Sequence, residues 1–331
     1  MEKRYHTARG FTLIELMIVL AVGLVLTLAM VSVYVNTKRN HVQNEQFSAM
    51  HENAGFAMRM LAQDLKSLGY LGRVIDSSLV SLDDTLALTQ DCGLAADDDW
   101  AYDVGSFGYL QHVNDATAAD AHTAHDCIAE ADVEADNDLV TVRRVKGETH
   151  TGALQDKTVY VRSNNVSACL WLYVNGTKDA PTGGSCPTAD FEDWPYIASV
   201  YFVRPYAEEA DDGIPTLCRK SLVVPTGTST PTMDTVCLAE GIEHFHVEYG
   251  LDTDGDGVAN QYDSAPTAAE VDSAVSARIY VLAKSPKQDP NYTNTKSYQM
   301  GLVTVDKNDN HYRRVYSTTV LLRNNAFAAQ L

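Results

Sequence analysis

The amino-acid sequence predicts an α+β fold in which a long N-terminal helix packs on an antiparallel β-sheet with disulfide-tied loops. Three observations predict it: an apolar helical pattern near the N-terminus, a later series of short β-type segments, and six cysteines that all lie beyond residue 90. Strands that follow one another without intervening helices favour antiparallel pairing. The chain has 331 residues and is 45% hydrophobic, so it can bury a sizeable core.

The charge balance narrows the classes of partner. The chain carries 44 Asp and Glu residues against 25 Lys and Arg, which gives a formal net charge of -19. Nucleic-acid binding needs clustered basic side chains that neutralise phosphates, so we expect no nucleic-acid partner. An acidic surface of this kind attracts cations instead.

The first half of the predicted helix has the length of a membrane span. Residues 16–37 are 22 positions without a charged side chain. As a helix they would extend about 33 Å, close to the thickness of the hydrocarbon core of a bilayer. The first ten residues hold three basic side chains and one acidic side chain, which favours a cytoplasmic N-terminus. No signal-peptide cleavage site follows the apolar run. We therefore expect residues 11–37 to be a transmembrane and assembly segment.

The helical pattern continues beyond this span. Apolar side chains recur at intervals of three and four, which marks one face of an amphipathic helix over residues 38–72. They are Phe47, Met50, Ala54, Ala57, Met58, Leu61, Leu65 and Leu68. Gly69 or Gly72 supplies a C-terminal stop. The sequence thus predicts one helix from Phe11 to Leu68, about 87 Å long.

The rest of the chain reads as β-structure of increasing regularity. We expect an irregular α+β region at 73–200 and an antiparallel sheet region at 201–331, because β-branched and aromatic residues alternate in short runs separated by turn residues. The predicted strands are 139–145, 158–162, 169–174, 198–205, 221–224, 241–249, 275–283 and 316–323.

The six cysteines predict disulfides, because no C-x-x-C motif indicates a zinc or redox site. They are Cys92, Cys127, Cys169, Cys186, Cys218 and Cys237. Six cysteines allow 15 pairings, among which the sequence does not choose; pairing of sequence neighbours is the most local solution.

An acidic motif at residues 252–263 has the spacing of a calcium-binding EF-hand loop. Counted from its first Asp, oxygen ligands fall at positions one, three, five, seven, nine and twelve, with Gly at six. The predicted ligands are Asp252, Asp254, Asp256, the backbone carbonyl of Val258, Asn260 and Asp263. The flanks lack helical patterns, and Asp replaces the usual Glu at position twelve. We expect a structural Ca²⁺ in a loop joining two strands; the alternative is a metal-free Asp/Gly turn.

No motif indicates catalysis, so we expect no enzymatic activity. The sequence lacks G-x-S-x-G, S-x-x-K, H-E-x-x-H and phosphate-binding P-loop patterns. His122 and His125, and likewise His244 and His246, have spacings that can bind a metal, but two ligands do not make a catalytic zinc site. His244 and His246 would share one face of a strand, in solvent or in a core that satisfies them.

One carboxylate stands inside the apolar segment. Glu15 follows Gly10 and Phe11, and the run Arg9–Leu16 (RGFTLIEL) resembles the class III signal of type IV prepilins and of type II secretion pseudopilins. The resemblance implies that a membrane prepilin peptidase removes residues 1–10, cutting between Gly10 and Phe11, and N-methylates Phe11. The new amino terminus would be cationic, so it can pair with Glu15 of a neighbouring subunit and set the register of a fibre.

The C-terminal third carries a second resemblance. The block 248–257 (EYGLDTDGDG) and the closing run 313–325 (RRVYSTTVLLRNN), in a chain longer than a simple pilin, resemble the PilW family of minor pilins. This implies a low-abundance subunit near the fibre tip that primes pilus assembly with other minor and major pilins and helps to present a PilY-type adhesin. It also implies a single-pass inner-membrane protein with a periplasmic body that later enters the extracellular pilus.

Three other interpretations stay open. A J-type minor pseudopilin of type II secretion would share every N-terminal feature. A calcium-dependent adhesive tip module would use the acidic loops to touch a surface directly. A membrane-tethered hydrolase has only generic polar residues in its favour.

Overall fold

The computed structural model describes residues 10–74, 76–88, 91–93, 100–104, 108–150, 152–183, 185–271 and 273–324. The leader predicted at residues 1–10 therefore lies outside the described residues, apart from Gly10. The chain divides into two compact units, residues 1–49 and residues 50–331, and each is described by itself.

One helix, α1 (Leu13–Lys66), crosses the boundary between the two units. It begins two residues later and ends two residues earlier than the sequence predicts. Gly69 follows it at a φ of 67°, a left-handed conformation that glycine adopts without strain and that commonly terminates helices. In the first unit, the large apolar side chains from Phe11 to Val35 are 52–85% exposed.

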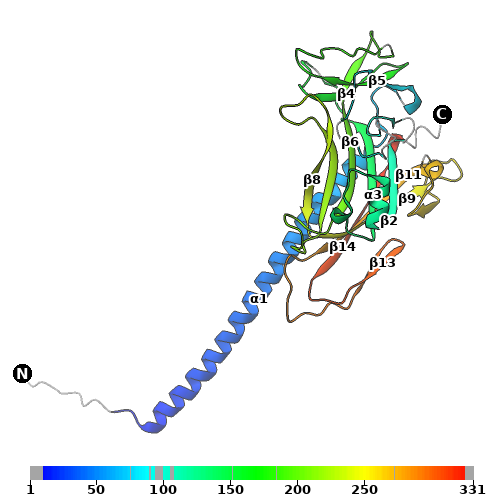
Figure 1. Ribbon diagram of the computed structural model, residues 1–331. Coiled ribbons are helices and arrows are strands. Elements are labelled where there is room, and N and C mark those ends of the chain that lie inside the picture. The colour runs from blue at the N-terminus through cyan, green and yellow to red at the C-terminus, as the bar shows by residue number, and fades with distance from the viewer. Residues whose placement is uncertain are drawn as a thin grey trace, which may run out of the picture. The chain divides into compact units, whose positions relative to one another are not determined.

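The body contains a sheet with the strand order β1-β5-β4-β6-β3-β2, to which β7 and β8 are added beside β6. Its strands are β1 (Val80–Leu82), β2 (Leu110–Ala116), β3 (Asn137–Val145), β4 (Thr158–Ser163), β5 (Ala168–Tyr173), β6 (Glu192–Arg204), β7 (Thr216–Val223) and β8 (Thr232–Glu240). The pairs are antiparallel except β1 with β5. The long strand β6 joins the parts, because it pairs with β4 at one end and with β3 and β7 farther along (Figure 1).

A second sheet has the order β10-β9-β11-β14, and β12 and β13 form a separate hairpin. These strands are β9 (Ile242–Leu251), β10 (Gln261–Asp263), β11 (Ala274–Lys284), β12 (Ser297–Met300), β13 (Val303–Asp306) and β14 (Arg313–Leu321). Short helical segments among the described residues accompany the sheets, namely η1 (Ser77–Leu79), α3 (Ala118–Ala124), η2 (Glu130–Asp132) and α4 (Ala268–Val271).

The predicted α+β fold class is confirmed. The region expected to be irregular contains β1–β5 and the start of β6, which are parts of one sheet. The sequence does not predict β1, β2, β8, β10, β12 or β13. Side chains of β8 are mostly exposed or half-buried because the strand lies at a sheet edge, so the run lacks the apolar alternation that marks a half-buried strand.

The C-terminal part of α1 packs into the larger core. Its buried apolar residues are those that the periodicity identifies from Met50 to Leu65, and Leu68, just beyond the helix, joins the same core. They join apolar side chains of both sheets, including Val140, Tyr201, Phe245 and Ile279. A second core, which includes Trp100, Trp194 and Phe202, packs with other residues of the eight-stranded sheet.

One buried charge lies among these apolar contacts. Asp64 of α1 accepts hydrogen bonds from Arg144 Nη2 (2.5 Å) and Nε (3.2 Å) of β3, and from the Tyr201 hydroxyl (2.5 Å) of β6. A buried charge is tolerated only when it is paired and hydrogen-bonded, and these contacts supply both requirements. The helix is thereby tied to two strands by polar contacts that apolar periodicity cannot reveal.

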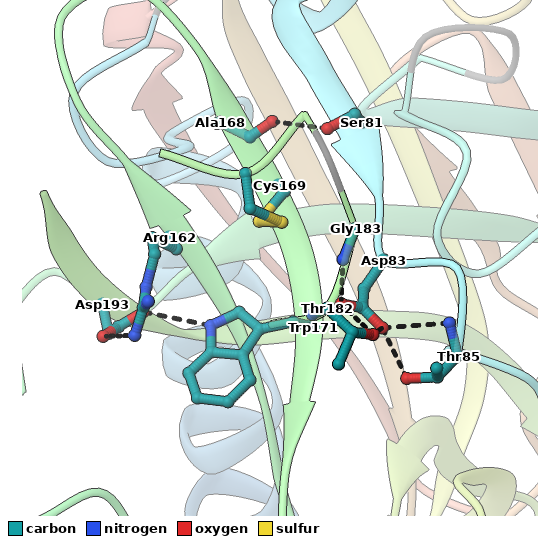
Figure 2. Close-up of a disulfide and its surroundings, with 11 residues drawn as sticks. Ser81, Asp83, Thr85, Arg162, Ala168, Cys169, Trp171, Thr182, Gly183 and Asp193 are labelled. Atoms are coloured by element: carbon teal, nitrogen blue, oxygen red, sulfur yellow. Dashed lines mark hydrogen bonds and ion pairs between the residues drawn. A yellow bond between two sulfur atoms is a disulfide. The ribbon is translucent and has the colours of Figure 1, made fainter. Parts of the chain in front are cut away.

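Three disulfides join cysteines that are neighbours in sequence, namely Cys92–Cys127, Cys169–Cys186 and Cys218–Cys237. Figure 2 shows the surroundings of the second one. Near it the Asp83 carboxylate accepts hydrogen bonds from Thr85 and from the backbone of Thr182 and Gly183. The loop before β6 is therefore held against β5 by the disulfide and against the end of β1 by Asp83.

We predict that Asp64→Asn lowers the free energy of unfolding by about 3–5 kcal/mol, because it leaves the buried Arg144 without its counter-charge. Denaturant unfolding of the full-length chain in detergent, followed by tryptophan fluorescence, measures the change. The exposed Asp84 provides the control, since Asp84→Asn should stay within about 0.5 kcal/mol of the parent chain. A loss below about 1 kcal/mol for Asp64→Asn would show that this network contributes little.

Candidate functional site

The predicted processing site lies in open surroundings. A Cβ atom placed on Gly10 would meet no heavy atom within 4 Å, and Phe11 is 85% exposed. The packing of this chain therefore does not require glycine at position 10. A requirement for glycine there would come from an enzyme that binds the segment, and the cleavage between Gly10 and Phe11 stays a prediction.

Glu15 takes part in a capping box at the start of α1. Its Oε2 accepts hydrogen bonds from the backbone N–H (2.9 Å) and the hydroxyl (3.0 Å) of Thr12, and its own N–H donates to Thr12 Oγ1 (3.3 Å). This reciprocal arrangement satisfies donors that a helix leaves unpaired at its N-terminus. Glu15 thus has a partner within its own chain, in addition to the intersubunit role that the sequence predicts.

The apolar half of α1 has the length and composition of a membrane-crossing helix. Among its few polar side chains, Thr27 donates a hydrogen bond from Oγ1 to the carbonyl of Gly23 (2.7 Å). A hydroxyl satisfied within its own helix is compatible with an apolar environment. The helix and the prepilin-type motif together suggest membrane anchoring and association with a pilus.

The acidic loop connects β9 to β10, two strands that pair with each other. Carboxylate oxygens of Asp252, Asp254 and Asp256 lie within 4.8 Å of one another. The backbone N–H groups of Gly255 and Gly257 each donate to Asp252 at 2.7 Å, and the bond from Gly257 contributes most to lowering the pKa of Asp252 below its ordinary value. The φ angles of Gly255 and Gly257 are 78° and 83°, left-handed values that other residues adopt only with strain.

The structure places the other predicted calcium ligands differently. Asn260 Oδ1 accepts hydrogen bonds from the N–H (2.8 Å) and hydroxyl (3.2 Å) of Thr253. Asp263 lies in β10, where its Oδ1 accepts from the N–H of Ala265 (2.9 Å), and it is not part of the three-carboxylate group. Val258 has an exposed side chain, and its N–H donates to Asp256 (2.8 Å). EF-hand spacing therefore brings together the first three ligands and not the twelfth position.

The four histidines with metal-type spacing differ in burial. His122 is exposed, whereas His125 is buried beside the Thr141 hydroxyl (2.8 Å), and burial lowers the pKa of His125 to about 3. His244 and His246 are buried in β9, and burial lowers the pKa of His244 to about 4.

His246 belongs to a group of side chains that the sequence does not predict. Its Nδ1, with oxygens of Asp115 and Asp138, forms a second set of potential metal ligands among the described residues. Burial alone would raise the pKa of Asp138, but attraction to His112 and contacts with both histidines outweigh it and lower that pKa. Asp138 ends a polar stretch (residues 134–138, EADND), where a carboxylate is ordinary, and no spacing motif links it to His246, so the sequence offers no signal for this group.

Comparison with known proteins agrees with the N-terminal and C-terminal resemblances. Residues 6–31 match the prokaryotic N-terminal methylation motif, and residues 200–324 match the family described as Type IV Pilus-assembly protein W, PilW. No curated protein matches the sequence. A type IV-like pilin from Thermus thermophilus is similar in structure with a TM-score of 0.34 and 13% identity, over 86% of this chain and 96% of that chain.

The methylation motif and the long apolar helix are together characteristic of type IV pilin-like proteins, which are made as prepilins. The C-terminal match adds a likeness to the PilW family over residues 200–324, and together these matches support a type IV pilus minor pilin of that family.

We predict that Gly10→Val blocks processing without disturbing the fold, because the side chain would enter open space. Intact-mass measurement of the purified chain should then find the leader still attached. A Cβ atom placed on Gly23 would likewise meet nothing within 4 Å, so Gly23→Ala is the matched control and should be processed normally. Maturation of Gly10→Val at the normal rate would contradict the assigned cleavage site.

Proposed function

We propose that this chain is a minor pilin that acts in type IV pilus biogenesis, priming assembly and joining other minor pilins in a tip complex with a PilY-type adhesin. One observation carries the proposal: the two parts of α1 have different surroundings. Residues 50–66 pack against the sheets of the same chain, whereas the large apolar side chains from Phe11 to Val35 are uncovered. The PilW match and the methylation motif support this function.

Before assembly, residues 11–37 cross the inner membrane once, and the body lies in the periplasm, while prepilin peptidase reaches the membrane-proximal leader from the cytoplasmic side. The three disulfides support an oxidising compartment for the body. During assembly the apolar segment moves from lipid into a bundle of helices of other pilins. Both surroundings are apolar, so the transfer needs only a modest driving force, and polar contacts decide which subunits fit.

Glu15 supplies such a contact. In an apolar bundle, its carboxylate is stabilised by the methylated amino terminus of a neighbouring subunit, because an unpaired charge at the centre of a membrane helix costs about 2.5–3.5 kcal/mol. The capping box with Thr12 orients the same carboxylate at the start of the helix. The intersubunit pair then sets the axial register of the subunit.

We further propose that the acidic loop binds Ca²⁺ as a structural ion. Three carboxylates that converge within 4.8 Å repel one another, and a hard cation that prefers oxygen ligands relieves this repulsion. Because the loop joins β9 to β10, the ion would rigidify one end of the second sheet. A tip module that adheres only with calcium would depend on this loop.

Substitutions at Glu15 and Thr12 distinguish the intersubunit pair from the capping box. Glu15→Gln keeps a side chain that can serve in a capping box but removes the charge, whereas Thr12→Ala keeps the charge and removes the cap. We predict that Glu15→Gln and Glu15→Ala reduce the amount of this chain in sheared pili by about tenfold or more, and that Thr12→Ala reduces it far less.

Quantitative mass spectrometry of sheared pili and of the membrane fraction provides the readout, and equal membrane levels show that each variant is stable. Normal incorporation of Glu15→Gln would contradict the charge pair. If the Glu15 variants leave pili unchanged but stop the secretion of exported enzymes, the chain is a J-type pseudopilin instead.

Calcium titration by calorimetry tests the acidic loop. We predict one site per chain, with Ca²⁺ affinity lowered by about tenfold or more in Asp256→Asn and much less in Asp263→Asn. Of these two residues, Asp256 belongs to the group of three carboxylates and Asp263 does not. Absence of binding at millimolar Ca²⁺ would establish the metal-free turn. Equal losses in the two variants would instead favour a complete EF-hand ligand set.

A further inference from the structure

A group of polar side chains lies where the two sheets meet, away from the acidic loop and the N-terminal segment. His112 comes from β2, Asp115 from the same strand, Asp138 from β3 and His246 from β9. The side chains of His112, Asp138 and His246 are at most 3% exposed, whereas that of Asp115 is 41% exposed. Three of the four side chains are therefore buried, and the group is open to solvent at Asp115.

The edge of β9 explains why Asp138 lies here. Residues 242–251 of β9 pair with β11 on one side, but β10 covers the other side only at residues 249–251. Farther along this edge, side chains of β3 accept hydrogen bonds from backbone N–H groups that β10 does not pair. Phe245 N donates to Asn137 Oδ1 and Val247 N donates to Asp138 Oδ2, each at 2.7 Å. Asp138 is thus fixed at the junction by the backbone of the second sheet.

A bulge in β2 brings Asp115 to the same place. The pairing of β2 with β3 shifts between Val113 and Ala116, and Asp115 has a φ of 44°. A bulge changes the direction of side chains, and a non-glycine residue in the left-handed region is strained. The strained residue places its carboxylate beside His246.

The distances match those between ligands of one metal ion. His246 Nδ1 lies 3.2 Å from Asp138 Oδ1 and 3.3 Å from Asp115 Oδ1. An ion about 2.0–2.2 Å from each of three ligands in tetrahedral geometry separates the ligand atoms by about 3.3–3.6 Å. Nδ1 carries at most one proton, so it cannot donate a full hydrogen bond to both carboxylates at once.

Two neighbouring buried atoms lack hydrogen-bond partners among the described residues. His112 Nε2 lies 2.9 Å from Asp138 Oδ2 but is not aligned with it as a hydrogen bond. Asn114 Nδ2 donates to Asp115 Oδ2 (3.1 Å), while Asn114 Oδ1 is buried without a donor. His112 Nε2 is therefore placed to hold the second oxygen of Asp138, and neither this nitrogen nor Asn114 Oδ1 is one of the three candidate ligands.

We propose that Asp115, Asp138 and His246 bind a divalent transition-metal ion of the Zn²⁺ type, with His112 positioning Asp138 through its second oxygen. One imidazole and two carboxylates suit Zn²⁺, whereas Ca²⁺ prefers six to eight oxygen ligands. The two carboxylates neutralise the dication, and exposed Asp115 gives it a path from solvent. The ion fastens the bulge of β2 to β9 and so connects the two sheets.

The affinity should be moderate. When Nδ1 binds the ion, the ring proton of His246 resides on Nε2, which is buried without an acceptor in the part of the chain that the structure describes. Metal-binding histidines usually donate this proton to a carboxylate or a carbonyl, and loss of that partner costs about 10–100-fold in affinity. We therefore expect micromolar rather than nanomolar binding.

Calorimetric titration of the full-length chain in detergent with Zn²⁺, after removal of metals by a chelator, tests the proposal. We predict one ion per chain, with affinity reduced by about tenfold or more in Asp115→Asn and in His246→Gln. Asp126 and His122 are exposed residues of the same types, so Asp126→Asn and His122→Gln are matched controls that should bind Zn²⁺ normally. Asp254→Asn should also bind normally, which separates this site from the acidic loop.

Circular dichroism of the metal-free variants establishes that each is folded. If His246→Gln does not fold, Asp115→Asn decides the question, because its side chain is partly exposed and nearly isosteric with the original. Absence of stoichiometric binding by the parent chain at submillimolar Zn²⁺ would overturn the proposal. Unchanged binding by Asp115→Asn, or equal loss in a control variant, would overturn it as well.

Discussion

The rest of the structure depends on how the apolar face of α1 is covered. A single helix carries both an amphipathic part, whose buried side chains from Met50 to Leu65 join the larger core, and a part that is apolar all round. A helix that is apolar on every side needs lipid or other helices around it. The sequence therefore encodes a chain whose folded body is complete while one segment still requires other molecules. In the function proposed above, assembly into a fibre satisfies that requirement.

In the body, polar contacts fix the relative positions of helices and strands that apolar packing alone does not fix. Asp64 ties α1 to β3 and β6 through Arg144 and Tyr201. At the junction of the sheets, Asn137 and Asp138 take the N–H groups at the open edge of β9. Unpaired edge groups invite pairing with other chains, so covering them with side chains protects the monomer. A defined orientation of the body would serve the role in a tip complex that is proposed above.

Much of this structure can be predicted from the sequence, and the failures have a common cause. The sequence predicts the helix to within two residues at each end because its apolar periodicity is long, and it predicts β3, β4 and β5 because they are buried and rich in β-branched residues. Edge strand β8 lacks that signal. The Asp138–His246 group joins residues more than a hundred positions apart, and linear spacing cannot show such contacts. The spacing also predicts a metal ligand at Asp263, which lies outside the group of three carboxylates because the hairpin holds it in β10.

The most direct test of this account is site-specific photocrosslinking in pili with p-benzoylphenylalanine at Leu24, which is 63% exposed in the single chain. The described cysteines are all in disulfides, so none of them offers a free thiol that could form a crosslink in place of the probe. We predict that irradiated pili yield crosslinks from position 24 to other pilin subunits. Recovery of the chain in pili with no crosslink to another subunit would contradict the account, because the uncovered half of α1 would then have no place in the fibre.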